Sequence, residues 1–469
     1  MEAIPPVDQL AISRPLDLLF GCAPKPVSCG RGVEIGTGQV LPEINFTLPP
    51  MTIEEQTWQE VRTQYTEIIQ GVCQRSVDLK VPGLVVEFEL LPPMTLQPKW
   101  GAEITELLVQ ALDEFHQKEG LRSALRVTPV DVRDKQRPPR MRSGELLEST
   151  LRSFELCAQA GADLLSIEST GGKELHDQAL VQADLEAIVF ALGVLTVHDM
   201  SYLWSRVVEI ANREGVIPAG DTACAFANTA MILAEKGMIP RVLAALVRIG
   251  AVVRSLEAHR QGAIGPSKDC AYEGPYLKAI LGVPISMEGR ASACAHLSTV
   301  GNIASACCDL WSNESVQNVR LLSTEAPVVS MEHLIYDCRL MNAALAEGHD
   351  AAHSLQRWMI ESDARHDPQA WILRPDVVLE ISSEIVKHEH PLAATLAAIE
   401  KGLAVIRQAS ADGRLDLPPV EHRWLDMLST QLETIPRDEE QLLAQVQSRY
   451  DGNVFIWEEY APYSSRTTI

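Results

Sequence analysis

Aromatic and basic residues are both scarce in this chain of 469 residues. Aromatic residues make up 5% of it, although hydrophobic residues make up 46%, so the core has to be aliphatic, as is typical of parallel sheets covered by helices. Lysine and arginine number 40 against 63 aspartates and glutamates, which gives a net charge of −23. A surface of that sign repels phosphate backbones and anionic lipid headgroups, so we expect neither nucleic acid nor a membrane as a partner.

A basic leader and long apolar runs are also lacking. The first ten residues hold Glu2 and Asp8 but no lysine or arginine, which argues against a secretory signal. The longest apolar runs, at 187–197 and 242–253, are shorter than the roughly 18 residues that a membrane span needs. We therefore expect a cytoplasmic protein, in which the ten cysteines are buried thiols, metal ligands or nucleophiles rather than a disulfide framework.

Short β-branched runs alternate with helical stretches through the middle of the chain, a pattern typical of parallel βαβ units. Eight strands are predicted, at 83–91, 124–132, 162–169, 187–195, 215–222, 262–264, 284–289 and 319–326. Helices are predicted between them, for example at 144–160, 200–213, 225–236 and 299–311. Eight such units favour a (β/α)8 TIM barrel, whose usual size is about 250 residues, and a doubly wound open sheet is the alternative.

The segments that flank the barrel differ from it in pattern. Residues 1–78 begin with a stretch rich in proline and glycine, and they are predicted to form an N-terminal arm and a helix packed on the barrel. Residues 79–346 form the predicted catalytic barrel. In residues 347–469 helical periods dominate, so this part is predicted as a C-terminal helical extension, and its apolar character makes a homodimer a reasonable expectation.

Three side chains that could bind a metal follow predicted strands and lie close to glycines. They are Glu168, Cys224 and Cys270. Because they follow different strands, they can meet only at the carboxyl-terminal rim of a closed barrel, where barrel active sites lie. Two thiolates and a carboxylate suit Zn²⁺ and leave its fourth position open, as in catalytic zinc sites. On the pattern alone, a cysteine after a strand is more often a small buried hydrophobic residue than a metal ligand.

Charged residues beside these three are candidates for orienting them, and each is also compatible with a surface or helix-capping role. They are Lys173, Glu174, Asp221, Lys268 and Asp269.

Other motifs are weaker. His349 and His353 have the spacing of a helical zinc protease motif, but Asp350 is one methylene shorter than the glutamate that acts as base there. The glycine-rich stretch 30–38 neither follows a clear strand nor opens a helix, which argues against a dinucleotide site. The Cys294–His296 segment either starts a helix or approaches the same barrel rim.

At the candidate ligands the sequence also resembles a known family. The segments that carry the resemblance are VEIGTGQVLPEINF (33–46), GADLLSIESTGGKE (161–174), AGDTACAFANTAM (219–231), GPSKDCAYE (265–273), CCDLWSNESV (307–316) and YDCRLMNAAL (336–345). They are similar, in order along most of the chain, to the zinc-dependent methanol:corrinoid methyltransferase subunit of methylotrophic methanogens and acetogens, the methanol-cobalamin methyltransferase B family.

The resemblance implies a barrel enzyme that binds methanol on one zinc ion per chain and transfers the methyl group to the Co(I) of a corrinoid. A separate small corrinoid-binding protein carries that corrinoid, which makes the chain the core of a hetero-oligomer. The family's zinc ligands correspond to Glu168, Cys224 and Cys270. A proton donor to the departing oxygen is also expected, and Asp221 and Asp269 are the candidates.

Four positions depart from the family pattern. Ala223 and Phe226 replace an acidic residue and a glutamine around the second ligand, Val127 replaces a histidine, and Arg290 replaces a lysine. Such changes make the site more apolar if they face it, which would suit a larger methyl donor such as a methyl ether or a methoxylated compound. Each is also compatible with a face that does not contact substrate.

Two further alternatives belong to different classes of protein. One is a non-catalytic scaffold for the corrinoid protein, against which the three intact ligands argue. The other is an unrelated barrel lyase or aldolase, which would need a Schiff-base lysine or a late phosphate-binding glycine loop, and no clear example of either occurs in the sequence.

Overall fold

A seven-stranded parallel sheet curls around the centre of the computed structural model, which describes residues 9–47, 52–268, 271–290, 299–316, 320–321, 324–450 and 452–461. In spatial order its strands are β7 (Ile217–Asp221), β6 (Leu164–Ile167), β5 (Ser123–Pro129), β4 (Leu84–Leu90), β3 (Leu41–Thr47), β9 (Leu310–Val316) and β8 (Ser286–Glu288). Every neighbouring pair of these strands is parallel.

The segment 264–267 closes the sheet. The N–H groups of Ile264 and Gly265 donate to carbonyls of β7, each at 2.9 Å. On its other side, Ser267 forms a parallel bridge with Ile285, directly before β8. The predicted (β/α)8 barrel is therefore confirmed, and the open doubly wound sheet is excluded.

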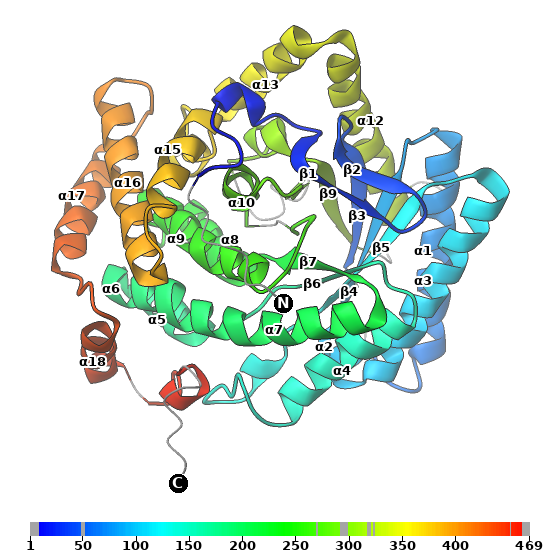
Figure 1. Cartoon of the computed structure of the whole chain (residues 1–469), viewed down its shortest axis with the longest axis horizontal. Helices are drawn as coiled ribbons and strands as arrows, with labels where there is room; N and C mark the ends of the chain where they lie inside the picture. Colours follow the sequence, from blue (N-terminus) through cyan, green and yellow to red (C-terminus); the bar gives the residue numbers. More distant parts are fainter. Residues whose placement is uncertain are drawn as a thin grey trace.

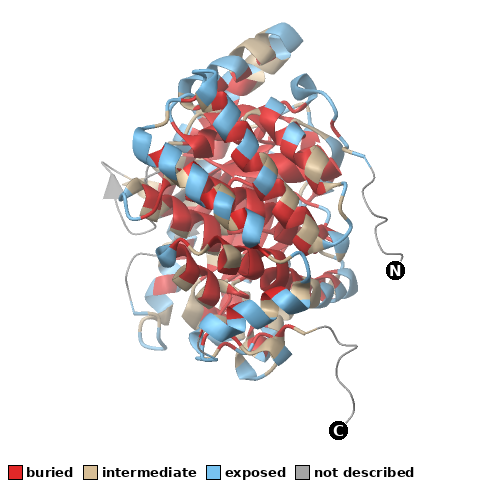
Figure 2. Ribbon diagram, turned by 90° about the vertical axis from the view of Figure 1, so that its left-hand side faces the viewer, coloured by how far each residue is buried: buried red, intermediate tan, exposed pale blue. Residues whose placement is uncertain are grey.

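Helices surround this barrel, as Figure 1 shows. Those that follow the barrel strands are α1 (Trp58–Asp78), α2 (Pro92–Leu96), α3 (Pro98–Glu119), α4 (Glu145–Gln159), α5 (Lys173–Gln182), α6 (Leu185–Phe190), α7 (Thr196–Glu214), α8 (Cys224–Glu235), α9 (Arg241–Arg260), α10 (Gly274–Leu281) and α12 (Ala326–Glu347). The C-terminal helices are α13 (His349–Asp363), α14 (Pro368–Trp371), α15 (Pro375–Ile385), α16 (Pro391–Ala411), α17 (Pro419–Thr434) and α18 (Glu439–Arg449). Buried residues fill the strands and the inner helix faces, while exposed residues lie outside (Figure 2).

An antiparallel hairpin covers the amino ends of the barrel strands. It consists of β1 (Cys22–Cys29) and β2 (Val33–Thr37). The N–H of Arg31, in the turn, donates to the carbonyl of Ser123 at the start of β5, at 2.7 Å. Apolar residues of the hairpin and of the strand starts form one buried cluster there, which includes Val33, Ile35 and Val85. This end of the barrel is therefore closed, and access to its interior has to come from the carboxyl ends.

The strands are buried on both faces, yet the face that points inward carries charge. In β4, Val85, Glu87 and Glu89 alternate with residues that pack against the helices. Period-two alternation places such residues on one side of the sheet. The interior thus becomes polar towards the carboxyl ends of the strands, the opposite of the usual aliphatic filling of a barrel.

A buried ion pair crosses the barrel interior. Arg126 of β5 donates from Nε to Oε1 of Glu43 in β3 at 2.6 Å, and neither side chain is exposed. A second guanidinium nitrogen, Nη1, donates to the hydroxyl of Ser166 in β6 at 2.8 Å and to the carbonyl of Pro266 at 2.9 Å. Ser286 of β8 donates its hydroxyl to the second oxygen of Glu43. One ion pair therefore links five of the eight barrel segments.

One continuous helical stretch, Leu185–Glu214, is long and apolar enough to cross a membrane by length and composition. Of the window that meets this test, 83% is buried inside the structure. The stretch joins α6 and α7 through a π-helical turn, Ala191–Leu195, that packs against α9 and α16. It is a core helix of this fold.

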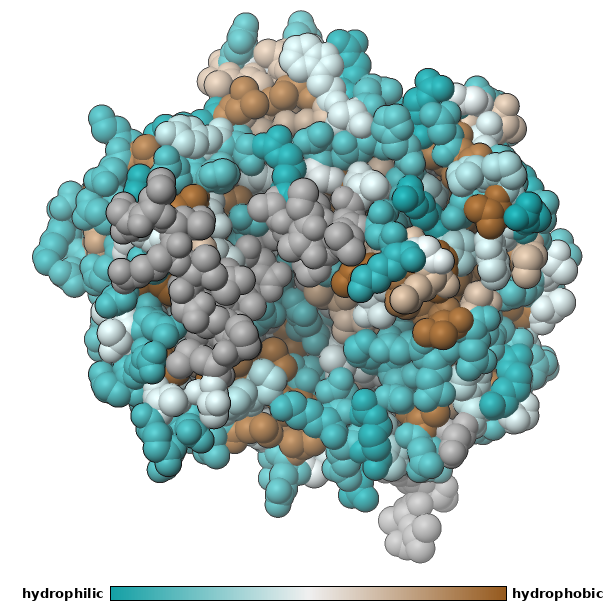
Figure 3. All heavy atoms as spheres, turned by 180° about the vertical axis from the view of Figure 1, so that it is seen from behind, coloured by the Kyte–Doolittle hydropathy of each residue, from teal (hydrophilic) through white to brown (hydrophobic). Residues whose placement is uncertain are grey.

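The face in Figure 3 shows hydrophobic side chains only in small separate groups among hydrophilic ones, as far as described residues are seen there.

Two predicted elements are wrong in type. The strand predicted at 187–195 is part of this helical stretch, because an apolar run buried on all sides carries no periodicity that separates helix from strand. The helix predicted at 299–311 is instead a short 3-10 turn, Ile303–Cys307, followed by β9. The strand predicted at 319–326 is absent from the barrel, since its described residues form a separate pair, β10 (Arg320–Leu321) and β11 (Thr324–Glu325).

Two barrel strands were not predicted at all. The predicted arm, residues 1–78, contains β3, which lies between β4 and β9. Its sequence LPEINFT and the LWSNESV of β9 interrupt the apolar pattern with polar residues. Glu43 of β3 is polar because it faces the buried guanidinium of Arg126. The N-terminal segment is therefore part of the barrel itself.

Removing one partner of this ion pair is expected to destabilise the fold strongly. Arg126→Met leaves the Glu43 charge buried, which should cost about 3–5 kcal/mol of unfolding free energy. The double variant Glu43→Gln/Arg126→Met should cost less than the two single variants added together, because no uncompensated charge remains. Urea denaturation followed by circular dichroism measures both effects.

The control for this prediction is Arg365→Met, which removes an exposed ion pair with Asp416 and should leave the midpoint unchanged. Equal midpoints for Arg126→Met and the wild type would contradict a structural role for the buried pair.

Candidate active site

Glu168 lies where the barrel opens. It directly follows β6 and forms a parallel bridge with Val130, which directly follows β5. Its side chain is 25% exposed, in contrast to the wholly buried Glu43 deeper in the barrel. Glu168, which follows this short strand, thus places a negative charge at the carboxyl-terminal rim.

Lys268 gathers carboxylates around one ammonium at this rim. Its Nζ lies 2.7 Å from Oε1 of Glu168, 3.0 Å from Glu87 and 3.3 Å from Glu89. Burial raises the pKa of Glu87, and the charge of Lys268 opposes that shift. Three carboxylates facing one lysine, itself 5% exposed, make a position that favours cations. Lys268 also lies two residues before Cys270 in the sequence, so a residue close to that predicted ligand along the chain contacts Glu168.

Cys224 is the first residue of α8, three residues after the end of β7. Its Sγ accepts a hydrogen bond from Nδ2 of Asn228, one turn further along the helix, at 2.9 Å. A helix N-terminus and an amide donor both stabilise negative charge on sulfur. The side chain is partly exposed, whereas Cys73, Cys157 and Cys338 are buried. Cys224 therefore has the surroundings of a ligand or nucleophile rather than of a packing thiol.

Asp221, the last residue of β7, is fully buried in a network of fixed partners. Its Oδ1 lies 2.7 Å from Nη2 of Arg254, and its Oδ2 accepts from Nε1 of Trp204 at 3.0 Å. The N–H of Ser169, next to Glu168, points at the same carboxylate at 3.4 Å. Burial raises the pKa of Asp221, and Arg254 opposes this. These contacts anchor the loop after Glu168 to β7. The role of Asp221 as proton donor stays a prediction.

Cys270 and Asp269 lie outside the described residues, but the residues on both sides of them in the sequence are described. On the near side, Lys268 contacts Glu168. On the far side, Glu273 accepts a hydrogen bond from the N–H of Ala223 at 2.6 Å, and Ala223 directly precedes Cys224. Lys268 thus contacts the first predicted ligand, and Glu273 contacts the neighbour of the second. Within the described ranges, no group of three or more His, Cys, Asp or Glu residues has a metal-binding arrangement.

The other charged candidates beside the predicted ligands have surface roles. Lys173 pairs with Asp177 one turn along α5, and Glu174 lies 2.8 Å from Nη2 of Arg137. Neither contact leads into the barrel.

Three of the four departures from the family pattern do not face the barrel interior in this structure, and the fourth, Ala223, is a buried residue directly before Cys224. Val127 lies on the outer face of β5, opposite to Arg126 and Thr128, and packs in the core shared with the helices. Phe226 is buried between helices, edge-on to His176 at 5.1 Å and beneath Arg254 at 5.4 Å. Arg290 is half-exposed and pairs with Asp337. These positions therefore give no structural reason to expect a larger methyl donor.

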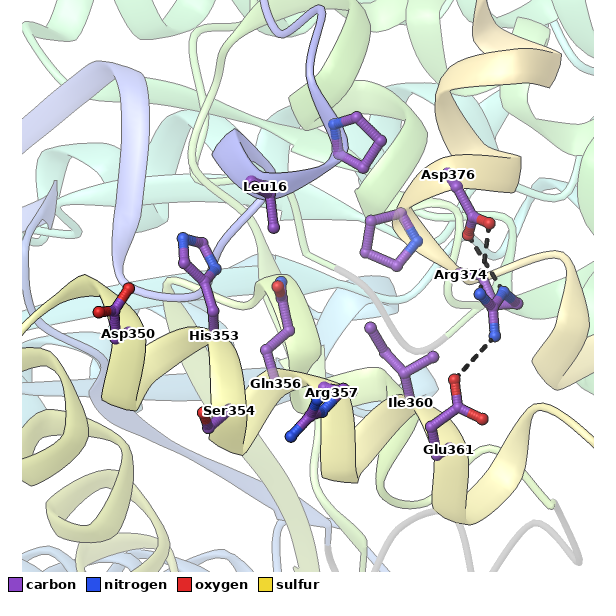
Figure 4. A pocket seen from close by; sticks show the side chains of 12 residues that line it. Leu16, Asp350, His353, Ser354, Gln356, Arg357, Ile360, Glu361, Arg374 and Asp376 are labelled. Carbon is purple, nitrogen blue, oxygen red and sulfur yellow. Dashed lines mark hydrogen bonds and ion pairs between the residues drawn. The ribbon is translucent and has the colours of Figure 1, made fainter.

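His353 lines a surface pocket, and His349 is the first residue of the same helix, α13. The pocket measures about 590 Å³ and lies between α13, the start of α15 and the 3-10 turn Pro15–Asp17. Figure 4 shows the pairing of Arg374 with Glu361 and Asp376 at its edge. Among the described lining residues there is no group of metal ligands. Stretch 30–38 forms the turn and second strand of the hairpin, and Cys294–His296 lies outside the described residues.

Sequence patterns did not single out the carboxylates of β4 or the amide of Asn228. The signals were present, since two glutamates interrupt the apolar run of β4, and Asn228 follows Cys224 at the one-turn spacing. The pattern could not show that Lys268, 179 residues from Glu89 in sequence, contacts both glutamates of β4.

Comparison with known proteins agrees with this architecture. The family model described as "Methanol-cobalamin methyltransferase B subunit" matches residues 6–461. A methanol–corrinoid protein co-methyltransferase from Methanosarcina barkeri (strain Fusaro) is 35% identical over 447 residues, covering 94% of this chain and 95% of that protein. The crystal structure of the methanol:cobalamin methyltransferase complex MtaBC from Methanosarcina barkeri is 34% identical, with a TM-score of 0.91, and the match covers 97% of this chain and 99% of that one.

The family model spans the hairpin, the barrel with its rim, and the C-terminal helices. The chain therefore belongs to the methanol-cobalamin methyltransferase B subunit family, and it is a methyltransferase.

Proposed function

We propose that this chain transfers the methyl group of methanol to the cobalt of a corrinoid that a separate small protein carries. The observation that carries the proposal is the likeness of the whole chain, at 35% identity, to a methanol–corrinoid protein co-methyltransferase, together with the pairing of Glu168 and Lys268 at the barrel rim. A barrel closed at one end and charged at the other suits a small polar substrate that enters from the rim.

One Zn²⁺ per chain is part of the proposal, with Glu168, Cys224 and Cys270 as its ligands. The donor set fits the ion, because zinc binds cysteine sulfur and carboxylate oxygen and needs an open fourth position for catalysis. The surroundings support this choice. Glu168 already takes a cationic partner, Lys268, and the Cys224 sulfur is held by a hydrogen bond from Asn228, as is common for metal ligands.

The reaction has to balance a poor leaving group against a strong nucleophile. The C–O bond of methanol breaks as the electron pair of Co(I) forms the new bond to carbon, and the departing hydroxide takes up one proton to give water. A zinc ion, when bound, supplies the Lewis acidity that weakens the C–O bond. Lys268 holds the Glu168 carboxylate at the open end of the barrel. The aliphatic core that packs around the strands limits access of water to the site.

Two residues are proposed as the source of the proton, Asp221 and Asp269. Asp221 is 0% exposed and bound to Arg254 and Trp204, so a direct transfer needs this network to open. Asp269 directly follows Lys268 in the sequence. The alternative of another methyl donor, such as a methoxylated compound, keeps the same ligands and the same corrinoid partner.

The metal assignment predicts about one zinc per purified chain. Cys224→Ser and Cys270→Ser should each lose most of it, because a neutral hydroxyl replaces a thiolate ligand. Cys22→Ser is the matched control, since Cys22 is also partly exposed but lies in β1. Elemental analysis after dialysis measures the content. Full zinc retention in both ligand variants would contradict the assignment, and zinc loss in the control would point to general unfolding.

The activity prediction concerns the methyl donor. With reduced cobalamin or the cognate corrinoid protein, methanol and the zinc-loaded chain should remove the Co(I) absorption and form methyl-cobalt. Glu168→Gln should reduce the rate by at least about 100-fold, the upper end of the effect of losing an outer partner of a metal ligand, because this variant removes a ligand itself. No reaction with methanol, combined with turnover of a methoxylated compound, would favour the alternative donor. No reaction with either would favour a scaffold.

A further inference from the structure

Backbone N–H groups of the loop that follows Glu168 donate hydrogen bonds to side chains that are distant in sequence. The N–H of Thr170 donates to Oδ2 of Asp131, beyond the end of β5, at 2.9 Å. The N–H of Gly172 donates to the hydroxyl of Tyr460, near the C-terminus, at 2.9 Å. With the contact of Ser169 to Asp221 at 3.4 Å, three of the four peptide groups that follow Glu168 are held from outside the loop.

Asp131 is itself fixed by a buried charge network. Arg133 donates to both of its oxygens, at 2.9 and 2.8 Å, and also to both oxygens of Asp199 of α7, at 2.8 Å each. Burial alone would raise the pKa of Asp131, but Arg133 and the N–H of Thr170 outweigh it, so the pKa is lowered. The carboxylate that receives the Thr170 N–H is therefore ionised and immobile.

The two glycines of the loop lie directly against α7 and the π-helical turn before it. A Cβ on Gly171 would lie 2.3 Å from Oδ2 of Asp199, so no larger residue fits there. Gly172 has a φ of +82°, and a Cβ on it would lie 3.1 Å from Cβ of Leu195. A π-helical turn often marks a functional site. Here the turn at Ala191–Leu195 places its own last residue and Asp199 beneath the loop.

The C-terminal segment 457–461, which contains Tyr460, is itself held by hydrogen bonds to the barrel. Glu459 accepts the N–H of Arg142 and the hydroxyl of Ser143, both at 2.7 Å. The carbonyl of Tyr460 lies 2.9 Å from Nδ1 of His198. Tyr460 is 1% exposed, so its hydroxyl reaches Gly172 from a fixed position, 288 residues away in sequence.

We propose that Tyr460 and Asp131 are positioning residues of the metal site, which hold the loop 168–172 so that the Glu168 carboxylate stays directed at the barrel opening. The proposal rests on the proposed function, in which Glu168 is a zinc ligand. A ligand followed by two glycines would otherwise sample many backbone conformations, and binding a metal would have to restrict them. Holding the peptide groups in advance makes metal binding tighter without adding a ligand.

The test is Tyr460→Phe, which removes one hydroxyl and keeps the buried ring. We expect zinc affinity, measured by competition with a chromophoric chelator, to fall by about 10-fold, the lower end of the effect of outer groups on metal sites. The visible absorption of the Co²⁺-substituted protein should change in energy or intensity, because the carboxylate geometry changes. Asp131→Asn keeps an oxygen acceptor for Thr170 but loses the charge, and it should weaken zinc binding by a similar factor.

Tyr450→Phe is the matched control. Its hydroxyl also binds one partner, Oδ2 of Asp184 at 3.0 Å, and it lies in the same C-terminal region but not at the loop. We expect wild-type zinc affinity and an unchanged Co²⁺ spectrum for this variant. Equal losses in Tyr450→Phe and Tyr460→Phe would overturn the proposal, because they would show a general effect of loosening the C-terminal segment.

Glu168→Gln separates failure of this proposal from failure of the proposed function. If Glu168→Gln binds zinc as the wild type does, the ligand assignment itself is wrong. If Glu168→Gln loses zinc while Tyr460→Phe and Asp131→Asn keep wild-type affinity and the wild-type Co²⁺ spectrum, the zinc site stands and the positioning role is refuted.

Discussion

The ion pair between Arg126 and Glu43 is the interaction on which the barrel depends. Both groups are wholly buried, so either charge without the other would strongly destabilise the fold. Only the contact between the two charges offsets the cost of burying them. Because the same guanidinium also binds Ser166 and the carbonyl of Pro266, it fixes β5 against β3, β6 and the closing segment. A polar centre of this kind specifies one arrangement of strands in a way that an aliphatic filling would not.

The interior changes character along the barrel axis. At the amino ends it is apolar and covered by the β1–β2 hairpin. One layer further it holds the Arg126 pair, and at the carboxyl ends Lys268 faces Glu87, Glu89 and Glu168. Charge therefore increases towards the opening, where the cost of burying it is lower. The same gradient closes one end to substrate and makes the other suitable for a cation and a small polar molecule.

Support for the rim comes from outside the barrel. Asp221 ends β7 and Asp131 follows β5, the strands on either side of β6. Asp199 belongs to α7, and Tyr460 belongs to the C-terminal segment. Each contacts the loop after Glu168, and two of the carboxylates share one arginine, Arg133. The C-terminal helices thus do more than cover the barrel, because the segment that follows them completes the surroundings of the candidate ligand.

The sequence by itself determined the class of fold and the location of Glu168 and Cys224 after strands, because local alternation and the residues that follow a strand are properties of short segments. It did not reveal β3 or β9, in which polar residues interrupt the apolar pattern, and it mistook a buried helix at 187–195 for a strand. The polarity of Glu43 in β3 is explained only by Arg126 in another strand. The contacts of Lys268 with three carboxylates and of Tyr460 with Gly172 were decided by the tertiary structure alone. Both join residues that are separated by up to 288 positions, and no local pattern encodes which distant side chains meet when the barrel closes.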